Sequence, residues 1–312
     1  MAVGRKTNVG VVGLGQWGKH HARIYAGLPD VNLVGVVDLA YHEARSFAHR
    51  YKTESFNDHR KLIGRVDAVS VVVPTALHFE VARDFLDAGV HVLVEKPMTT
   101  TTEEAADLVR LADQRELMLL VGHVERFKPA VRRLVELAKE PVFIQTRRMR
   151  PYDASRVMDV GVVLDLMIHD IDIVLSITGG RVVEIEGMGV RIHNAHEDLA
   201  VAKIKMASGC VAWLMASRVS AEKVAEIEVT TADRSIRLDY HRQQITIHPF
   251  GGETERMLIR GDEPLRAELR HFMNCVQGLE RPLVTGEAGL RALEITLDLT
   301  ERMAVVAPPV RV

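Results

Sequence analysis

The chain has 312 residues, of which 47% are hydrophobic, and this length and composition predict two domains with ordinary globular cores. The formal net charge is −2 and no basic block occurs, so the charge indicates neither a nucleic-acid nor an anionic-membrane partner. Two isolated cysteines, the lack of a long apolar run and a first strand close to Met1 predict a cytoplasmic protein with reduced thiols, no membrane span and no secretory leader.

Up to Gly122 the chain alternates strand and helix, which is the pattern of a parallel, doubly wound sheet. The expected strands are Asn8–Val12, Leu33–Val37, Val66–Val73, Val90–Val94 and Leu117–Val121. The expected helices are Trp17–Ala26, Ala40–Tyr51, Leu77–Ala88 and Glu103–Arg115. We therefore predict an α/β domain over residues 1–122.

After Gly122 the pattern changes to helices followed by closely spaced strands that alternate polar and apolar residues. The expected helices are Phe127–Lys139, Val160–Ile177, Pro264–Gly278 and Glu287–Val305. The expected strands are Val142–Met149, Val182–Val190, Leu199–Met206, Cys210–Val219, Val224–Thr231, Ser235–Tyr240 and Gln244–Pro249. Residues 123–312 should thus form a second, α+β domain with a mostly antiparallel sheet.

A dinucleotide site is predicted where the first strand ends. The residues assigned to the cofactor in this loop are Gly13, Gly15, Gln16, Trp17 and Gly18. Gly13 allows a tight turn, Gly15 lets the backbone approach a pyrophosphate, and the next helix presents free N–H groups to phosphates. Asp38 ends the second strand twenty residues after Gly18, where it can bind a ribose hydroxyl and repel a 2′-phosphate. The pattern favours NAD(H) over NADP(H); the alternative is a chance glycine turn.

A lysine follows the fourth strand in the sequence Glu95-Lys96-Pro97. Ligands of open parallel sheets lie beyond the carboxyl ends of the strands, so Lys96 should point toward the reactive end of a bound cofactor. Its ammonium could donate to a substrate oxygen or, with a lowered pKa, accept a proton. The alternative is a surface lysine.

Two titratable residues, Asp165 and His169, lie four apart on an otherwise strongly apolar predicted helix that starts near Gly161. A carboxylate can orient an imidazole and keep it basic, as a general acid or base requires. The alternatives are a helix-dipole acid with a core histidine, or half of a metal site. No third ligand occurs at a matching spacing, so we predict no metal.

The fifth predicted strand is followed by Gly122-His123-Val124-Glu125-Arg126-Phe127. His123 and Arg126 are therefore expected at the carboxyl edge of the sheet, where they could contact a substrate. The alternative is a linker that happens to be polar.

In their order and separation, these motifs resemble the Gfo/Idh/MocA oxidoreductases over nearly the whole chain. The resemblance implies a Rossmann domain followed by a domain with a large open-faced sheet, sugar or cyclitol substrates, and oligomers built through that sheet. It implies that Lys96 and His169 flank the hydroxyl being oxidised and that Asp165 holds the substrate or orients the catalytic groups. The cofactor would also be bordered by Pro74, Thr75, His78, Glu95 and Lys96.

A narrower likeness concerns residues 122–129 and 159–166, which resemble the branch that acts on UDP-N-acetylated hexosamines as 3-dehydrogenases. This chain has Lys128 where that branch usually has Asn. A UDP-sugar needs cations for its diphosphate, and Arg148 and Arg156, in and near the run Arg147-Arg148-Met149-Arg150, are candidates. A solvated strand end is the alternative for each arginine.

We predict an NAD-dependent dehydrogenase that oxidises a secondary hydroxyl of a sugar, in particular of a UDP-N-acetylated hexosamine. Whether Lys96 or His169 accepts the proton stays open. The alternatives are a free-sugar or inositol dehydrogenase of the same family, or a catalytically silent NAD-binding regulator. Val211, Trp213 and Met215 alternate along one predicted strand and need a partner surface, so we expect a homodimer or homotetramer through the second sheet.

Overall fold

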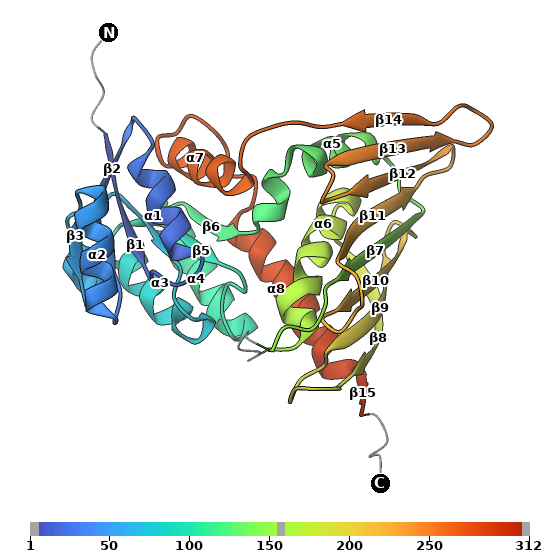
Figure 1. Cartoon of the computed structure of the whole chain (residues 1–312), viewed down its shortest axis with the longest axis horizontal. Coiled ribbons are helices and arrows are strands. Elements are labelled where there is room, and N and C mark those ends of the chain that lie inside the picture. The colour runs from blue at the N-terminus through green and yellow to red at the C-terminus, as the bar shows by residue number, and fades with distance from the viewer. Residues whose placement is uncertain (1–5, 155–159, 308–312) are drawn as a thin grey trace. The chain divides into compact units, whose positions relative to one another are not determined.

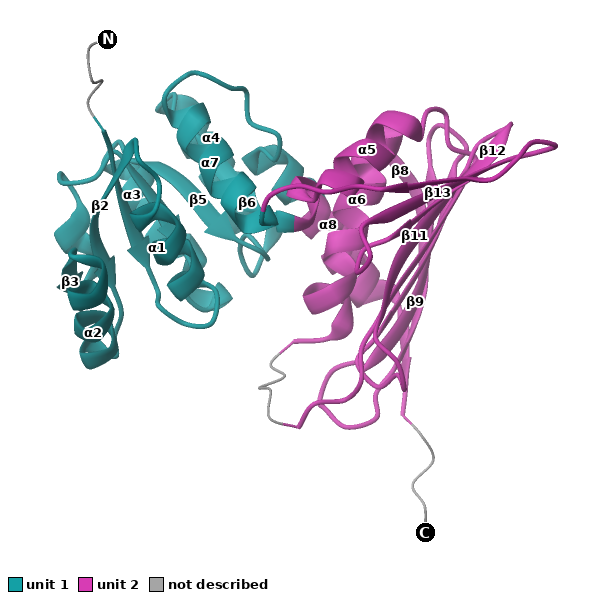
Figure 2. Ribbon diagram, turned by 45° about the horizontal axis from the view of Figure 1, so that its top comes forward, with its two compact units in different colours: residues 1–124, 263–291 teal, residues 125–262, 292–312 magenta. Residues whose placement is uncertain are grey.

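The computed structural model describes residues 6–154 and 160–307. The chain divides into two compact units, which Figure 2 colours teal and magenta: unit 1 comprises residues 1–124 and 263–291, and unit 2 comprises residues 125–262 and 292–312. Unit 1 thus includes residues 263–291, which lie within the second domain predicted from the sequence, residues 123–312.

Unit 1 contains a six-stranded sheet in the order β3-β2-β1-β4-β5-β6, and all of its pairs are parallel. The strands are β1 (Thr7–Val12), β2 (Val31–Val37), β3 (Glu54–Phe56), β4 (Ala68–Val71), β5 (His91–Glu95) and β6 (Leu119–Gly122). The helices are α1 (Gly18–Ala26), α2 (Tyr41–Tyr51), α3 (His78–Asp87), α4 (Thr102–Gln114) and α7 (Pro264–Val276), with the 3-10 turns η1 (His59–Leu62) and η2 (Thr75–Leu77). The predicted doubly wound sheet is confirmed.

Helices cover the sheet of unit 1, and its central strand β4 is buried at every residue. Side chains of α1, α2 and α7 share one apolar cluster with β1 and β2. The helices α3 and α4 pack against each other (Figure 1). At the start of α4, the Thr101 hydroxyl oxygen accepts a hydrogen bond of 3.2 Å from the Glu104 N–H and so caps the helix.

Unit 2 contains a nine-stranded sheet in the order β14-β13-β12-β11-β7-β10-β9-β8-β15, in which only the β7–β10 and β8–β15 pairs are parallel. The strands are β7 (Phe143–Met149), β8 (Val182–Val190), β9 (Leu199–Met206), β10 (Val211–Ser217), β11 (Val224–Thr230), β12 (Arg234–Asp239), β13 (Gln244–Pro249), β14 (Glu255–Leu258) and β15 (Ala304–Val306). The helices are α5 (Pro129–Leu137), the π-helical turn η4 (Val163–Met167) and α6 (Ile168–Thr178), while the 3-10 turn η3 (Val124–Phe127) and α8 (Gly286–Arg302) each start in unit 1 and end in unit 2.

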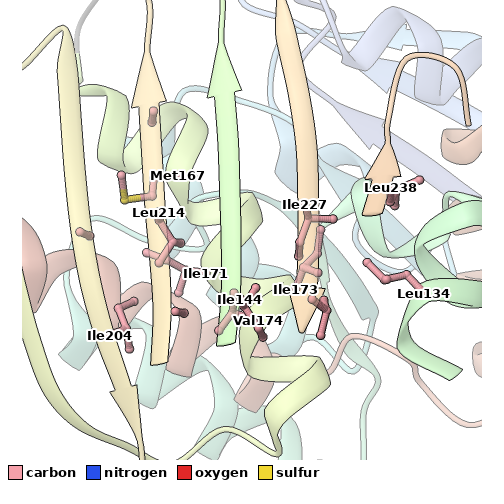
Figure 3. Close-up of a cluster of buried hydrophobic side chains, with 14 of the residues drawn as sticks. Leu134, Ile144, Met167, Ile171, Ile173, Val174, Ile204, Leu214, Ile227 and Leu238 are labelled. Carbon is pink, nitrogen blue, oxygen red and sulfur yellow. The ribbon is translucent and has the colours of Figure 1, made fainter. Parts of the chain in front are cut away.

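The core of unit 2 lies between one face of this sheet and the helices α5, α6 and the C-terminal half of α8 (Figures 1 and 2). Figure 3 shows Leu134 of α5 and Ile171 of α6 among side chains from the strands, such as Leu214 and Ile227. Strands such as β9 and β11 alternate buried and partly buried residues, so every second side chain faces the core. The opposite face carries exposed side chains, including Trp213. The mostly antiparallel sheet is confirmed.

Three details differ from the sequence prediction. The helix expected over Val160–Ile177 begins with the π-helical turn η4 before α6. The last predicted helix ends at Arg302, and the residues that follow pair with β8 as strand β15. Strands β3 and β14 escape prediction because they are three and four residues long, too short to show a period.

Candidate active site

The glycine loop of unit 1 has the geometry that a dinucleotide requires. Gly13 has a φ of +93°, and a Cβ there would meet the carbonyl of Val72. A Cβ on Gly18 would meet the carbonyl of Gly13, so the start of α1 packs directly on the strand end. At Gly15 a Cβ would meet no atom within 4 Å, and the residue is exposed, so this part of the backbone is open to a ligand. The exposed backbone and the N-terminus of α1 fit a pyrophosphate.

Asp38 lies at the end of β2 beside this loop. One carboxylate oxygen accepts a 2.7 Å hydrogen bond from the Leu14 N–H, and the other accepts a 2.8 Å hydrogen bond from the Ala40 N–H. Each oxygen of a carboxylate has a second lone pair, so Asp38 can still accept hydrogen bonds from ribose hydroxyls. The structure thus brings together the two elements that the sequence predicts for NAD.

The segment after β4 carries Pro74, Thr75 and His78. Pro74 precedes the short turn η2 and is exposed, and Thr75 is partly exposed in that turn. His78 is buried instead: its Nδ1 lies 2.9 Å from the Pro97 carbonyl oxygen and its Nε2 2.8 Å from the Val73 carbonyl oxygen. Burial lowers the pKa of His78, against the effect of the two carbonyl contacts. His78 therefore ties this segment to the one that follows Lys96.

The Glu-Lys-Pro motif turns its glutamate inward. Glu95 accepts a 3.1 Å hydrogen bond from His21 Nε2, and the Lys96 N–H lies 3.2 Å from its other oxygen. Burial raises the pKa of the Glu95 carboxyl, but the hydrogen bond and charge of His21 and the charge of Lys96 outweigh it, so the net pKa lies below its usual range. Lys96 is partly exposed, and the Lys96–Pro97 peptide bond is cis. Glu95 thus links the backbone of Lys96 to His21 through its two carboxylate oxygens.

A buried carboxyl group that sequence reasoning missed is Glu268 of α7. It is 1% exposed, and neither carboxyl oxygen has a hydrogen-bond partner among the described residues. Burial and the neighbouring charge of Glu95 raise the pKa of Glu268 well above its usual range, because both disfavour the charged carboxylate. A signal existed: Glu268 falls between Leu265 and Phe272 on the apolar stripe of its helix.

His123 follows β6 in unit 1 and is buried at 1% exposure, with its N–H donating to the Val121 carbonyl at 2.8 Å. Arg126 comes shortly after, in unit 2, where it pairs with Asp172 at 3.3 Å. The Arg126 side chain is 14% exposed. Both side chains are therefore largely buried, and only the small exposed fraction of each could contact a substrate.

The basic run on β7 does not form one patch, because successive residues of a strand face opposite sides of the sheet. Arg147 is on the exposed face and pairs with Glu226 at 2.9 Å. Arg148 points into the core, where it makes a bidentate pair with Asp170 at 2.7 and 3.0 Å and contacts Glu125 at 3.4 Å. Burial alone would lower the pKa of Arg148, but these two carboxylates raise it well above its usual range.

Arg148 therefore has its guanidinium occupied in the interior, with its charge also 4.9 Å from the ring centre of Tyr240. We propose a structural role for it in place of phosphate binding. Arg156, the other diphosphate candidate, lies outside the described residues.

Asp165 and His169 lie across the junction between the π-helical turn η4 and α6. Asp165 accepts a 3.1 Å hydrogen bond from Arg150 and is 32% exposed. His169 follows in the first turn of α6 and is partly exposed. The structure thus leaves both side chains in reach of a ligand, and Arg150 fixes the direction of the carboxylate. Single-turn π-helices of this kind occur often at functional sites.

Among the described residues, no group of three or more His, Cys, Asp or Glu side chains is placed to hold a metal ion. The helices described are all too short or too polar to cross a membrane.

Two family models match the chain. The model described as "Oxidoreductase family, NAD-binding Rossmann fold" matches residues 7–123, and the "GFO/IDH/MocA C-terminal domain" matches residues 140–237. The first description confirms the predicted NAD-binding Rossmann domain.

Individual relatives match along almost the whole chain. It is 34% identical to the UDP-N-acetylglucosamine 3-dehydrogenase of Acidithiobacillus ferrooxidans over 96% of this chain and 97% of that protein. A solved structure of that enzyme superposes with a TM-score of 0.91, at 33% identity over 96% of this chain and 98% of the other. The scyllo-inositol 2-dehydrogenase (NAD(+)) of Bacillus subtilis is 27% identical over 93% of this chain and 92% of that protein.

Proposed function

Because the chain belongs to the Gfo/Idh/MocA family of NAD-binding oxidoreductases, we propose that it oxidises the 3-hydroxyl of a UDP-N-acetylated hexosamine such as UDP-N-acetylglucosamine. The observation that carries this substrate class is the 34% identity to a UDP-N-acetylglucosamine 3-dehydrogenase, which extends over 96% of the chain. The family resemblance and the dehydrogenase class that the motifs predict are confirmed.

The roles proposed for the catalytic residues follow from their chemistry. NAD, when bound, supplies the nicotinamide ring that takes up the hydride from the substrate carbon. His169 or Lys96 accepts the hydroxyl proton; where His169 is the acceptor, the Lys96 ammonium stabilises the negative charge that develops on the oxygen. Asp165, held by Arg150, binds the substrate or orients these groups.

The cofactor is assigned to the exposed glycine loop with Gln16 and Trp17, and to Asp38 for the ribose. The open backbone at Gly15 supports this assignment. Pro74 and Thr75, which are at least partly exposed, remain proposed contacts near the nicotinamide ribose. For Glu95 and His78, their burial favours a supporting role behind the cofactor.

The proposal keeps only part of the set of substrate-contact residues that was predicted from the sequence. His123 and Arg126 keep their proposed role because they follow β6, the carboxyl edge at which ligands of parallel sheets bind. Thermal-shift measurements with UDP-sugars and with free polyols test the substrate class, because a ligand that binds only the folded state raises the melting temperature. A shift with UDP-N-acetylglucosamine alone supports the proposal, and a shift with free polyols alone contradicts it.

A second candidate is oxidation of a free polyol, which the 27% identity to a scyllo-inositol 2-dehydrogenase favours. A catalytically silent regulator has less support, because it would need none of Lys96, Asp165 and His169, and the chain has all three.

We propose that the chain works in the cytoplasm as a homodimer or homotetramer that uses the open face of the second sheet. Trp213 is 43% exposed on that face, with Val211 and Met215 beside it on β10. Light scattering tests the proposal, and a monodisperse monomer would contradict it.

A further inference from the structure

The helix that carries Asp165 and His169 receives its N-terminal cap from a distant segment. The Val163 N–H donates a 3.1 Å hydrogen bond to Oε1 of Glu197, and the Val162 N–H donates one of 3.1 Å to the Glu197 backbone carbonyl. Val162, the N-cap residue of this turn, makes no side-chain cap hydrogen bond itself within the described part of the chain. Glu197 thereby satisfies two N–H groups that a helix start leaves without partners.

Gly161 is explained by the same residue. A Cβ on Gly161 would run into the carboxyl group of Glu197. Its φ lies outside the left-handed region, so the need for glycine here is one of space and not of backbone freedom. Gly161 and Glu197 therefore fit each other as a pair.

A buried ion pair holds Glu197 in its place. Arg218 donates to Oδ1 of Asp198 at 2.8 Å, to the Glu197 carbonyl at 3.2 Å and to the Val160 carbonyl at 2.8 Å. Arg218 is 1% exposed and Asp198 is fully buried. One guanidinium thus ties the residue before Gly161 to the segment that supplies the cap.

Because the turn before α6 is π-helical, the contacts of Glu197 with Val162 and Val163 bear on the direction of the side chains in that turn. Residues 163–167 form wider i→i+5 turns, whereas the following residues are α-helical. If the first turn rewound as an α-helix, the residues before α6 would shift by one position, a rotation of about 100° at Asp165. An anchor at Val162 and Val163 opposes that change.

We propose that Glu197 is a positioning residue for the reaction: its cap fixes the start of the π-helical turn and so the direction in which Asp165 points relative to His169 of α6. This inference rests on the proposed catalytic roles of those two residues.

The test uses Glu197→Ala, Glu197→Gln, Gly161→Ala and the double variant Gly161→Ala/Glu197→Ala, with Glu222→Ala, an exposed residue of a loop in the same unit, as control. Gln keeps an oxygen that can accept the Val163 N–H, so Glu197→Gln should keep kcat close to that of the wild type. Glu197→Ala and Gly161→Ala should each lower the kcat for oxidation of UDP-N-acetylglucosamine by roughly 10- to 100-fold. The affinity for NADH should stay unchanged.

The double variant gives the sharpest readout. Because Gly161→Ala acts by displacing Glu197, adding it to Glu197→Ala should lower kcat no further. If the losses of kcat in the two single variants instead multiplied in the double variant, the inference would be overturned. A kcat in Glu197→Gln as low as that in Glu197→Ala would also overturn it. So would kcat in Glu197→Ala within twofold of the wild type.

Hydrogen–deuterium exchange of residues 161–169 separates this inference from the proposed function. If the wild type oxidises no UDP-sugar, the proposed function fails, but the exchange comparison still decides whether Glu197 anchors the turn. Faster exchange in Glu197→Ala and wild-type exchange in Glu197→Gln are expected. Equal exchange in all three proteins would overturn the anchor itself.

Discussion

The carboxylate of Asp38 accepts a 2.7 Å hydrogen bond from the backbone N–H of Leu14, between the first two glycines of the Gly13–Gly18 loop. The residue that we propose distinguishes NAD from NADP is therefore also hydrogen-bonded to the loop that we propose binds the phosphates. A change at Asp38 should affect both cofactor choice and loop geometry, and the two effects can be separated by the choice of substitution.

We expect Asp38→Asn to raise the preference for NADP(H) relative to NAD(H) by roughly 10-fold or more in kcat/KM, because it removes the charge that repels a 2′-phosphate. The amide oxygen can still accept from Leu14, so NAD(H) binding should weaken less than in Asp38→Ala. Steady-state kinetics with both cofactors measure this. A wild-type protein that already prefers NADP(H) would show that our interpretation of Asp38 is wrong.

Lys96→Ala and His169→Ala should each lower kcat by about 10²- to 10⁴-fold, because each removes a group proposed to handle the hydroxyl proton. The quenching of protein fluorescence by NADH should show that the cofactor still binds. Lys139→Ala, which changes an exposed lysine in unit 2, serves as the control. Near-normal turnover in both variants would remove the catalytic assignment.

The stability of the protein should depend on pH through Glu268. Its pKa is raised in the folded state by burial and by the charge of Glu95, so the folded protein keeps a proton that the unfolded chain releases above about pH 4.5. The unfolding free energy contributed by this group is fully present below that pH and is lost as the pH rises through the folded-state pKa.

Glu268→Gln removes this ionisation. Urea unfolding between about pH 5 and pH 9 should therefore show the variant gaining in unfolding free energy relative to the wild type as the pH rises. Glu253→Gln, at an exposed loop position, should follow the wild type throughout. A constant difference between wild type and Glu268→Gln would mean that Glu268 ionises normally.

Arg148→Met should lower the unfolding free energy by about 3–5 kcal/mol, because it leaves Asp170 buried without its partner. Arg147→Ala, at the neighbouring exposed position, should change it by less than about 1 kcal/mol. Urea unfolding of both variants tests the structural role of Arg148. If Arg148→Met instead unfolded like the wild type and only raised KM for a UDP-sugar, the sequence-based assignment to the diphosphate would be right.

Local signals predicted most of the fold. The strand, glycines and acid around Gly13–Asp38 lie within one short stretch, so their spacing alone indicated the first domain and its cofactor. Strand β15 was missed because Ala304–Val306 follows a long helix without a break and pairs only with the distant strand β8.

The parts of the site that sequence reasoning missed depend on contacts between distant residues. Gly161 stood in the motif, but its partner Glu197 is brought to it only by the packing of Arg218 and Asp198. The opposite directions of Arg147 and Arg148 could have been expected from strand alternation once β7 was predicted. The buried partners of Arg148 could not, because Asp170 lies on another element.

The central claim is tested most directly by incubating the purified protein with NAD⁺ and UDP-N-acetylglucosamine and following the absorbance of NADH. N-acetylglucosamine and myo-inositol are measured in parallel. We expect NADH to form with the UDP-sugar, with a higher kcat/KM than for either free compound, and Lys96→Ala to slow its formation by about 10²- to 10⁴-fold. Turnover of the free polyol without turnover of the UDP-sugar would contradict the proposed function.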